Sequence, residues 1–194
     1  MDLENSKKSF YRETLGNINL NKTNIAGKEF ENCTFENCSF IEIIFENCKF
    51  MDCVFNDCIL SAIKAPLSTF SEIQFNNSKI IGFNWTTAKS LRLLEFKNSQ
   101  LTYSNFELLK LPHLKIINCH ANEINFSGSD LTEADFTNSN LEKSIFFNTN
   151  LTKTNFQKAY NYSIDFKSNK LKKTIFSTPE AFSLLNNLDI ILKN

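Results

Sequence analysis

Six cysteines are the side chains of this sequence best suited to chemistry, because thiolates bind metals, form disulfides and act as nucleophiles. Five of them lie between Cys33 and Cys58 at intervals of five or ten residues, and the sixth is Cys119. They are poorly placed as metal ligands, since C-x4-C exceeds the spacing of common zinc knuckles and no histidine accompanies them. The constant interval of five indicates a structural repeat instead.

No other group of residues indicates catalysis. His113 and His120 are distant from any serine, cysteine or carboxylate in a recognisable arrangement. The sequence contains neither a phosphate-binding glycine loop nor an HExxH-type site. We therefore predict no catalytic residue, no cofactor, no metal site and no enzymatic activity.

The composition describes a single domain of ordinary size. The 194 residues carry 21 basic and 21 acidic side chains, so the overall charge gives no reason to expect nucleic acid or an anionic membrane as a partner. The polar N-terminus lacks the apolar core of a signal peptide, and no apolar run approaches the roughly 18 residues of a membrane span. We expect a cytoplasmic protein that binds neither membrane nor nucleic acid directly.

Large apolar residues recur at every fifth position, so one repeated element must place them. These centres run through residues 15–85 and, after one step of six residues, through 91–176. The exceptions to a large apolar side chain are Ala65, Ala121 and Asn161. The predicted organisation is a polar N-terminal lead or cap (1–14), the repeat region (15–176, with a frame slip at 86–91) and a C-terminal module (177–194).

A second position also faces inwards. Two residues before each centre stands a smaller side chain such as Cys33, Ser99 or Ala134. Alternate residues of an extended segment point to the same side, so each five-residue unit forms one side of a coil. Leucine and phenylalanine centres alternate after the slip, and stacking like on like requires an even number of sides. Four sides is the smallest workable number, which predicts an all-β solenoid, a quadrilateral β-helix with four repeat units in each coil.

Centres that lie four repeat units apart should stack in the core as ladders of like side chains. About eight coils at a strand spacing of ~4.8 Å make a rod roughly 40 Å long. The core residues that we predict in these ladders are Phe30, Phe35, Phe50, Phe55, Phe106, Phe126, Phe146, Phe166, Leu111, Leu131 and Leu151.

The stretch SDLTEADFTNSNLEKSIFFNTNLTKTNF at 129–156 resembles the A(D/N)LXX repeat of pentapeptide repeat proteins. The resemblance covers about residues 15–176 and implies a right-handed, four-sided β-helix. It also implies that Asp130 and Asp135, at the D/N position, bond to their own turns. The FENC units of the first half are similar to those of a bacterial subset that protects DNA gyrase and topoisomerase IV. That subset includes quinolone-resistance pentapeptide proteins and the microcin B17 immunity protein.

The four-unit coil stacks Cys33 on Cys53 and Cys38 on Cys58. Such pairs are just close enough for disulfides, so disulfide, metal and purely structural roles are all conceivable. Free cysteine is among the most buried residue types and fits beside a phenylalanine ring, and reduced thiols suit a cytoplasmic protein. We expect structural cysteines that fill the space beside the rings.

The six-residue step in WTTAKSL (85–91) adds one residue to the repeat. We expect a bulge or widened corner without loss of stacking, and the alternative is a kink or contact point that re-aims nearby side chains. Pro66 and Pro112 each follow a centre and should lie in corners where no backbone donor is needed.

The C-terminal residues abandon the repeat and are suited to cap the open end of the coil. Ser177 or Thr178 can N-cap a short helix with Pro179 in its first turn, and residues 189–192 can follow as a strand. The apolar side chains exceed what one helical stripe needs, so the cap either closes a monomer or also pairs with its copy across a twofold axis. We expect the homodimer, as in topoisomerase-binding relatives, through Phe182, Leu184, Leu185, Leu188 and Ile191.

Charge and apolar residues are unevenly spread over the outward positions. Residues 29–60 carry seven acids and one lysine, whereas residues 143–173 carry seven lysines and one aspartate. This polarity either steers an elongated charged partner or is an ordinary solvated surface. Several outward positions in the acidic half are apolar, and they form either a contact patch or ordinary edge packing: Ile41, Ile44, Val54 and Ile59.

Two hypotheses for the function follow. The resemblance implies a rod that mimics duplex DNA and binds a type II topoisomerase such as DNA gyrase, which it protects or inhibits. The acidic half agrees with this hypothesis, and the basic last coils do not. The alternative is a scaffold for an unrelated protein partner without DNA mimicry, which the neutral total charge and the outward aliphatic residues favour. DNA mimicry predicts binding that weakens at high salt, and a scaffold predicts binding insensitive to salt.

Overall fold

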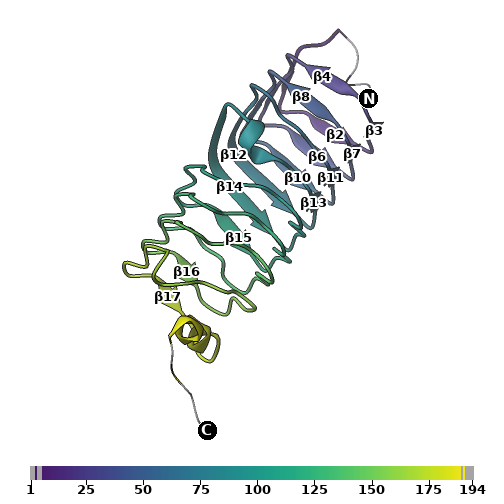
Figure 1. Cartoon of the computed structure of the whole chain (residues 1–194). Helices are drawn as coiled ribbons and strands as arrows, with labels where there is room; N and C mark the ends of the chain where they lie inside the picture. Colours follow the sequence, from purple (N-terminus) through teal and green to yellow (C-terminus); the bar gives the residue numbers. More distant parts are fainter. Residues whose placement is uncertain (1–2, 4–5, 189, 191–194) are drawn as a thin grey trace.

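The chain forms a right-handed, four-sided β-helix of about eight turns in a computed structural model (Figure 1). The structure describes residues 3, 6–188 and 190. Equivalent residues of successive coils lie four repeat units apart, so that Phe10 pairs with Phe30 and Leu15 with Phe35 in parallel ladders. This register confirms the predicted solenoid and its four-unit coil.

Each of the first two coils contributes one short strand to each of four faces, which we number 1 to 4 in chain order. Face 1 comprises β1 (Ser9–Tyr11), β5 (Glu29–Glu31), β9 (Lys49–Met51) and the first parts of β12 (Thr69–Asn76) and β14 (Ser90–Lys97). Face 2 comprises β2 (Thr14–Gly16), β6 (Thr34–Glu36), β10 (Val54–Asn56), the last parts of β12 and β14, β15 (Lys115–Ile117), β16 (Asn155–Phe156) and β17 (Ile175–Phe176). Face 3 comprises β3 (Asn19–Asn21), β7 (Ser39–Ile41), β11 (Ile59–Ser61) and β13 (Lys79–Ile81), and face 4 comprises β4 (Asn24–Ala26) and β8 (Ile44–Glu46).

The corners require a backbone conformation that most residues avoid. Two residues after nearly every centre the chain adopts a positive φ, as at Asn17 (φ 56°) and Asn37 (φ 50°). Asparagine reaches this left-handed region at a lower cost than most residues, which explains much of its abundance in the sequence. Corner asparagines also join successive coils, since the Asn138 amide donates to Asn118 at 2.8 Å.

The later coils are held mainly by single bridges and by side-chain turns. Beyond Ile117 isolated parallel bridges keep the coils in register. The Asp130 carboxylate accepts a hydrogen bond from the backbone N–H of Thr132 at 3.1 Å, and Asp135 accepts one from Thr137 at 2.9 Å. The predicted turn bonds of both aspartates are confirmed.

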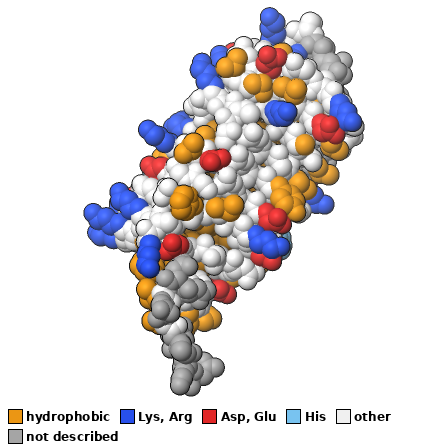
Figure 2. Space-filling view, viewed as in Figure 1, with side chains coloured by type: hydrophobic (Ala, Val, Ile, Leu, Met, Phe, Trp, Pro, Cys, Tyr) orange, Lys and Arg blue, Asp and Glu red, His pale blue; other side chains and the backbone are white. Residues whose placement is uncertain are grey.

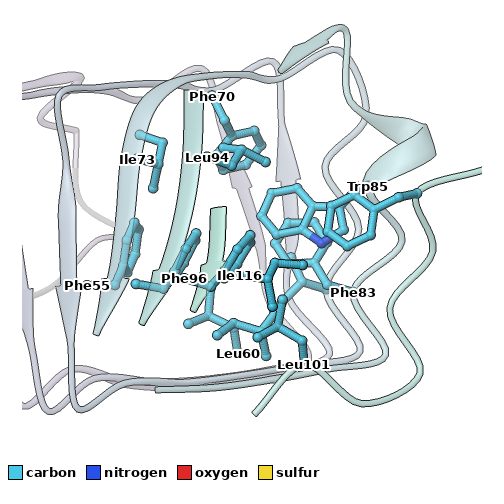
Figure 3. Close-up of a cluster of buried hydrophobic side chains, with 14 of the residues drawn as sticks. Phe55, Leu60, Phe70, Ile73, Phe83, Trp85, Leu94, Phe96, Leu101 and Ile116 are labelled. Atoms are coloured by element: carbon cyan, nitrogen blue, oxygen red, sulfur yellow. The ribbon is translucent and has the colours of Figure 1, made fainter. Parts of the chain in front are cut away.

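Stacked rings fill the interior (Figure 3), where the labelled Phe55, Phe96 and Trp85 point inwards. Phe30 stacks on Phe50 with 4.8 Å between ring centroids, and the rings of Phe35 and Phe55 are 4.4 Å apart. Such ladders give a gap-free core because each coil repeats the shape of the coil below it. The predicted core residues that the structure buries are Phe30, Phe35, Phe50, Phe55, Phe106, Phe126, Phe146, Leu111, Leu131 and Leu151.

Phe166 is not part of this core, and its predicted place there is wrong. In the last complete coil Phe146 pairs with Ile164 and not with Phe166, the centre that the regular repeat would place there. Tyr162 and Ile164 therefore take the inward positions, and Phe166 is 39% exposed. The cause is Asn161 at the predicted centre, because an amide has no hydrogen-bond partner in an apolar interior. Its side chain instead donates a hydrogen bond at the surface.

The first coil starts within the segment that was predicted to be a polar lead. β1 begins at Ser9 and pairs with β5. Phe10 is buried, and its ring stacks on Phe30 at 4.9 Å. Leu3 is also buried in the core at this end.

The extra residue of the frame slip lies at the corner between faces 4 and 1. A 3-10 turn, η1 (Trp85–Thr87), forms there, and the Asn84 side chain accepts a hydrogen bond from the backbone N–H of Thr86 at 3.2 Å. Thr69 accordingly pairs with Ser90 in the next coil, one residue beyond the regular interval that pairs it with Lys49 in the coil before. The widened corner predicted from the sequence is therefore present, and on face 2 the Phe96 ring still stacks on Phe75. The expectation that no stacking is lost is wrong for face 1, where Leu91 is only half-buried.

A 3-10 helix, η2 (Glu180–Asn187), follows the last coil at the C-terminal end (Figure 1). Its N-cap residue is Pro179 and no side chain caps it, so the predicted cap by Ser177 or Thr178 is wrong. The carbonyl of Ser177 instead accepts from the N–H of Ala181 at 3.0 Å. Leu184 packs against the core from this helix. The strand predicted at 189–192 falls almost entirely outside the described residues.

Candidate interaction surfaces

The cysteines lie in the interior, where some of them belong to a hydrogen-bonded spine. At the corner between faces 2 and 3, one position of successive coils holds either cysteine or serine, in the order Cys38, Cys58, Ser78, Ser99, Cys119 and Ser139. The backbone N–H of Cys38 donates to the sulfur of Cys58 at 3.4 Å, and that of Cys58 donates to the Ser78 hydroxyl at 2.9 Å. The same pattern of hydrogen bonds continues towards the C-terminus as far as Ser139. Sequence reasoning treated cysteine only as an apolar filler and missed this role, although the exchange of cysteine for serine from coil to coil signals it.

Burial keeps the thiols of Cys53 and Cys119 protonated. It raises the pKa of Cys53 to about 12 and that of Cys119 to about 11. All six cysteines are free and buried. Buried, protonated thiols are poor nucleophiles and poor ligands. Within the described part of the chain, no cluster of three or more His, Cys, Asp or Glu side chains is arranged to hold a metal ion.

Both histidines are exposed on the surface of the rod. The Nδ1 atom of His113 lies 3.4 Å from the carboxylate of Glu133, which also bonds to Lys153 at 2.6 Å. Lys153 lowers the pKa of the Glu133 carboxyl. These residues belong to three successive coils, so the cluster is a cross-coil charge ladder.

The acidic residues of 29–60 surround the rod. Glu31 points outwards from face 1 and Glu46 from face 4. Part of the charge is neutralised across coils, as where Lys49 bonds to Glu29 at 2.7 Å. Figure 2 shows charged side chains of both signs scattered over the visible face. The charge polarity is therefore a property of the two ends and not of one stripe along the rod.

The predicted contact patch divides over three faces. Ile41 and Ile59 lie on the neighbouring strands β7 and β11 of face 3, and each is 37% exposed. Ile81 extends this surface on β13. Ile44 points outwards from face 4, and Val54 lies on face 2. Because each five-residue unit ends at a corner, residues close in the sequence face different directions, and only the face 3 members form one surface.

Exposed apolar side chains are present at the C-terminal end of the rod, as they are elsewhere on the visible face (Figure 2). Phe182 in η2 is 58% exposed, and Ile175 in β17 is 46% exposed. Of the other residues predicted for a dimer interface, Leu184, Leu185 and Leu188 are half-buried, and Ile191 lies outside the described residues. This end thus presents more apolar surface than a cap of the last coil needs.

On face 1 the parallel backbone pairing of successive coils is interrupted once. It is continuous from β1 to β14 and resumes at Lys110, which pairs with Asp130. Between 90–93 and 110–113, both fully described, no backbone hydrogen bond joins the two coils. The same two coils remain paired on faces 2, 3 and 4. The coils therefore separate on face 1 alone, directly after the widened corner.

The unpaired segments form the walls of a cleft of about 420 Å³. Leu91 is a centre at this point, but it is only half-buried, whereas its counterparts Phe70 and Leu111 are 2% and 3% exposed. The frame slip marks this region in the sequence. The step from Leu91 to Leu111 is the regular one of four repeat units, so the spacing does not predict the gap between the two coils. The cleft is lined by Leu91, Arg92, Leu93, Leu94, Lys110, Leu111, Pro112, His113 and Leu114.

No helix in the described part of the chain combines the length and the apolar character needed to cross a membrane.

Two family profiles match the sequence. Residues 28–106 match a profile described as a pentapeptide repeat region, and residues 115–146 and 131–160 match one described as pentapeptide repeats. A comparison with curated protein sequences gives no match.

Solved structures with a similar fold include a trypsin-treated variant of QnrB1, a plasmid-mediated fluoroquinolone resistance protein. It is 18% identical, and the match covers 93% of this chain and 100% of that chain with a TM-score of 0.61. HetL, a pentapeptide repeat protein involved in heterocyst differentiation regulation from the cyanobacterium Nostoc sp. strain PCC 7120, is 17% identical. That match covers 88% of this chain and 90% of HetL with a TM-score of 0.35. At these identities the comparison with QnrB1 shows the fold.

Proposed function

Because the chain belongs to the pentapeptide repeat family, we propose that it is a non-enzymatic binding protein whose partner is a type II topoisomerase, DNA gyrase or topoisomerase IV. The observation that carries this proposal is the acid-rich part of the rod, since seven acids and one lysine give residues 29–60 a net charge of −6. An elongated acidic surface suits an enzyme surface that binds duplex DNA. The fold shared with QnrB1, a fluoroquinolone resistance protein, is the reason to test this partner first.

We assign the DNA-like surface to the acidic coils only. Residues 143–173 carry seven lysines and one aspartate, a net charge of +6, and such a segment would be repelled by a DNA-binding groove. The acidic coils surround the rod with carboxylates on more than one face, as the phosphates surround a duplex. Protection or inhibition of the enzyme would follow from occupation of its DNA site.

The C-terminal end is the proposed homodimer interface. Phe182 and Ile175 are exposed there, and the half-buried leucines of η2 continue the apolar surface. A twofold axis through this cap would bury the surface against its copy, and twofold dimers are the commonest oligomers. The dimer would then present its two acidic ends outwards.

Supercoiling of DNA by purified gyrase, with and without ciprofloxacin, tests the function. The protein at low micromolar concentration should protect or inhibit the enzyme, and the effect should weaken as salt is raised, because charge carries the contact. A lack of effect at low and at high salt would contradict the proposal.

A matched pair of charge reversals locates the surface. Asp57 and Glu123 are both exposed corner residues with positive φ, at 53° and 56°, so lysine in either place imposes the same backbone demand. Asp57→Lys should weaken the effect on gyrase several-fold, and Glu123→Lys, outside the acidic coils, should leave it unchanged. Equal losses in both variants would point to the total charge of the rod and away from a DNA-like surface.

One observation favours a second function, a scaffold for an unrelated protein. Ile41, Ile59 and Ile81 are neighbours on face 3, and an aliphatic surface of this kind binds through burial of apolar area. Such binding should persist at high salt and be lost in an Ile41→Lys, Ile59→Lys double variant. Gyrase activity should then be unaffected by the protein at any salt concentration.

A further inference from the structure

We propose that the cleft on face 1 is a docking site for an extended segment of a partner protein. The segment would pair main chain to main chain with the walls at 90–93 and 110–113, place one aliphatic side chain in the cleft and present an acidic side chain to Lys110. This surface is separate from the acidic coils and from the C-terminal end, so the inference does not depend on the partner proposed above.

The walls carry backbone N–H and C=O groups that form no hydrogen bonds between these two coils, although the equivalent groups one coil later do. One coil further on, the N–H groups of Leu111 and His113 donate to the carbonyls of Asp130 and Thr132 at 2.8 and 3.0 Å. The equivalent N–H groups of Leu91 and Leu93 make no hydrogen bond to the next coil along the chain. A strand edge with free donors and acceptors is the usual template for the addition of an extended peptide.

The dimensions and lining of the cleft suit a side chain of such a peptide. Its volume is about 420 Å³, which is within the range of sites that bury small ligands. Six of its nine lining residues are leucine or proline, and the half-buried Leu91 contributes apolar surface that is covered at the equivalent place in other coils. Strand addition takes its affinity from main-chain hydrogen bonds and its specificity from pockets of this kind.

The charges of the cleft lining favour a peptide that carries an acidic residue next to the aliphatic one. No acidic residue lines the cleft. Arg92 is already paired with Glu72, and His113 lies 3.4 Å from Glu133. Lys110 is thus the cation of the lining that makes no ion pair within the described part of the chain.

An extended peptide fits the walls better than the other possible occupants. Successive residues of a strand present both N–H and C=O groups, so both walls can be paired. A small apolar carboxylate would use the donors and leave the carbonyls of Lys110 and Pro112 unpaired. A second copy of the rod has its own unpaired segments only as the same two walls, and most of its other described coils are bonded to their own neighbours.

Titration of the full ¹⁵N-labelled chain with a capped pentapeptide, acetyl-Thr-Ile-Asp-Ile-Thr-amide, tests the proposal by amide chemical shifts. At up to about 5 mM peptide the shifts should change at 91–94 and 110–114 and hardly elsewhere. Lys110→Gln should raise the dissociation constant about threefold or more. The matched control Lys79→Gln, an exposed lysine of β13 on face 3, should leave it unchanged.

Two further ligands separate main-chain pairing from simple apolar binding. The same peptide with alternate backbone nitrogens methylated keeps its side chains but loses donors, and it should bind about tenfold more weakly. Equal binding of the methylated peptide overturns the proposal, as does the absence of shift changes at about 5 mM of the unmodified peptide. If sodium octanoate moves the cleft amides and the peptide does not, the cleft binds small apolar acids and the proposal is wrong.

Discussion

The position two residues before each centre contributes to the fold in two ways. The N–H of Cys48 donates to the Ser68 hydroxyl at 2.8 Å, and that hydroxyl donates to the carbonyl of Phe45 at 2.7 Å. One small side chain thus joins two coils and also fills the space beside a ring. Its burial in a low-dielectric interior strengthens these bonds and makes the loss of an acceptor costly.

The buried Cys119 thiol should make the protein less stable at alkaline pH. Burial raises the pKa of Cys119 from 9.0 to about 11, so above pH 9 the unfolded chain loses a proton that the folded chain keeps. The stabilisation is therefore complete below pH 9 and is lost between pH 9 and 11, at up to about 1.4 kcal/mol per pH unit. Urea denaturation at several pH values should show this decrease. Cys119→Ser, which retains the polar atom, should show a smaller one, and an equal decrease would contradict this assignment.

Replacement of a ladder ring should destabilise the fold far more than replacement of an exposed ring nearby. Phe126 is fully buried between Phe106 and Phe146, at centroid distances of 5.5 and 5.1 Å. Phe126→Ala should lower the free energy of unfolding by about 3–5 kcal/mol, because the flanking coils cannot close the cavity. Phe147 is 55% exposed, and Phe147→Ala should cost less than about 1 kcal/mol. Denaturant titration of both variants checks the inward assignment, which a loss below about 1 kcal/mol for Phe126→Ala would refute.

At the scale of the element, the five-residue unit could be predicted from the sequence because both of its inward positions and its corner leave a mark on residue type. The deviations could not be predicted, since they depend on contacts between coils. Asn161 keeps the spacing of a centre, yet the chain shifts to bury Tyr162 and Ile164. The gap next to Leu91 similarly arises one coil after the extra residue, where the sequence spacing is again regular.

The missing backbone pairing between 90–93 and 110–113 should be visible in amide hydrogen exchange. The N–H groups of Leu91 and Leu93 make no bond to the next coil, whereas those of Leu111 and His113, their counterparts one coil later, do. Exchange at the first two should be about 100-fold faster or more, because it needs no opening of a ladder bond. Leu111 and His113 are matched controls, because Leu91 and Leu111 are both centres and Leu93 and His113 are both corner residues. Equal protection of the two pairs would show that the coils close on face 1 in solution.

At the scale of the whole molecule, the rod has unlike ends. Acidic coils lie toward the N-terminus and lysine-rich coils toward the C-terminus, although the total charge is zero. Charges this far apart are screened from one another at physiological salt, so each end acts on a partner independently. The two ends therefore suit different tasks, the acidic end for a DNA-binding protein and the apolar C-terminal end for a copy of the chain.

The proposed dimer brings the two lysine-rich ends together, which predicts an unusual dependence on salt. Each chain contributes a net charge of +6 from 143–173 near the interface. Added salt screens this repulsion, and the apolar contact is not weakened by it, so the dimer should become tighter as salt rises. Binding to gyrase should show the opposite trend, because there unlike charges attract.

Sedimentation equilibrium at low and high salt measures this dimer. Phe182 is the most exposed described residue of the proposed interface, and Phe182→Asp should give monomers because it buries a carboxylate in an apolar contact. Tyr103 is similarly exposed, at 59%, but lies in the middle of the rod, so Tyr103→Asp should leave the dimer intact. A wild-type chain that stays monomeric at about 100 µM at high salt would exclude the C-terminal dimer. A dimer that dissociates as salt rises would place the interface between an acidic and a basic end, which is a head-to-tail or antiparallel arrangement.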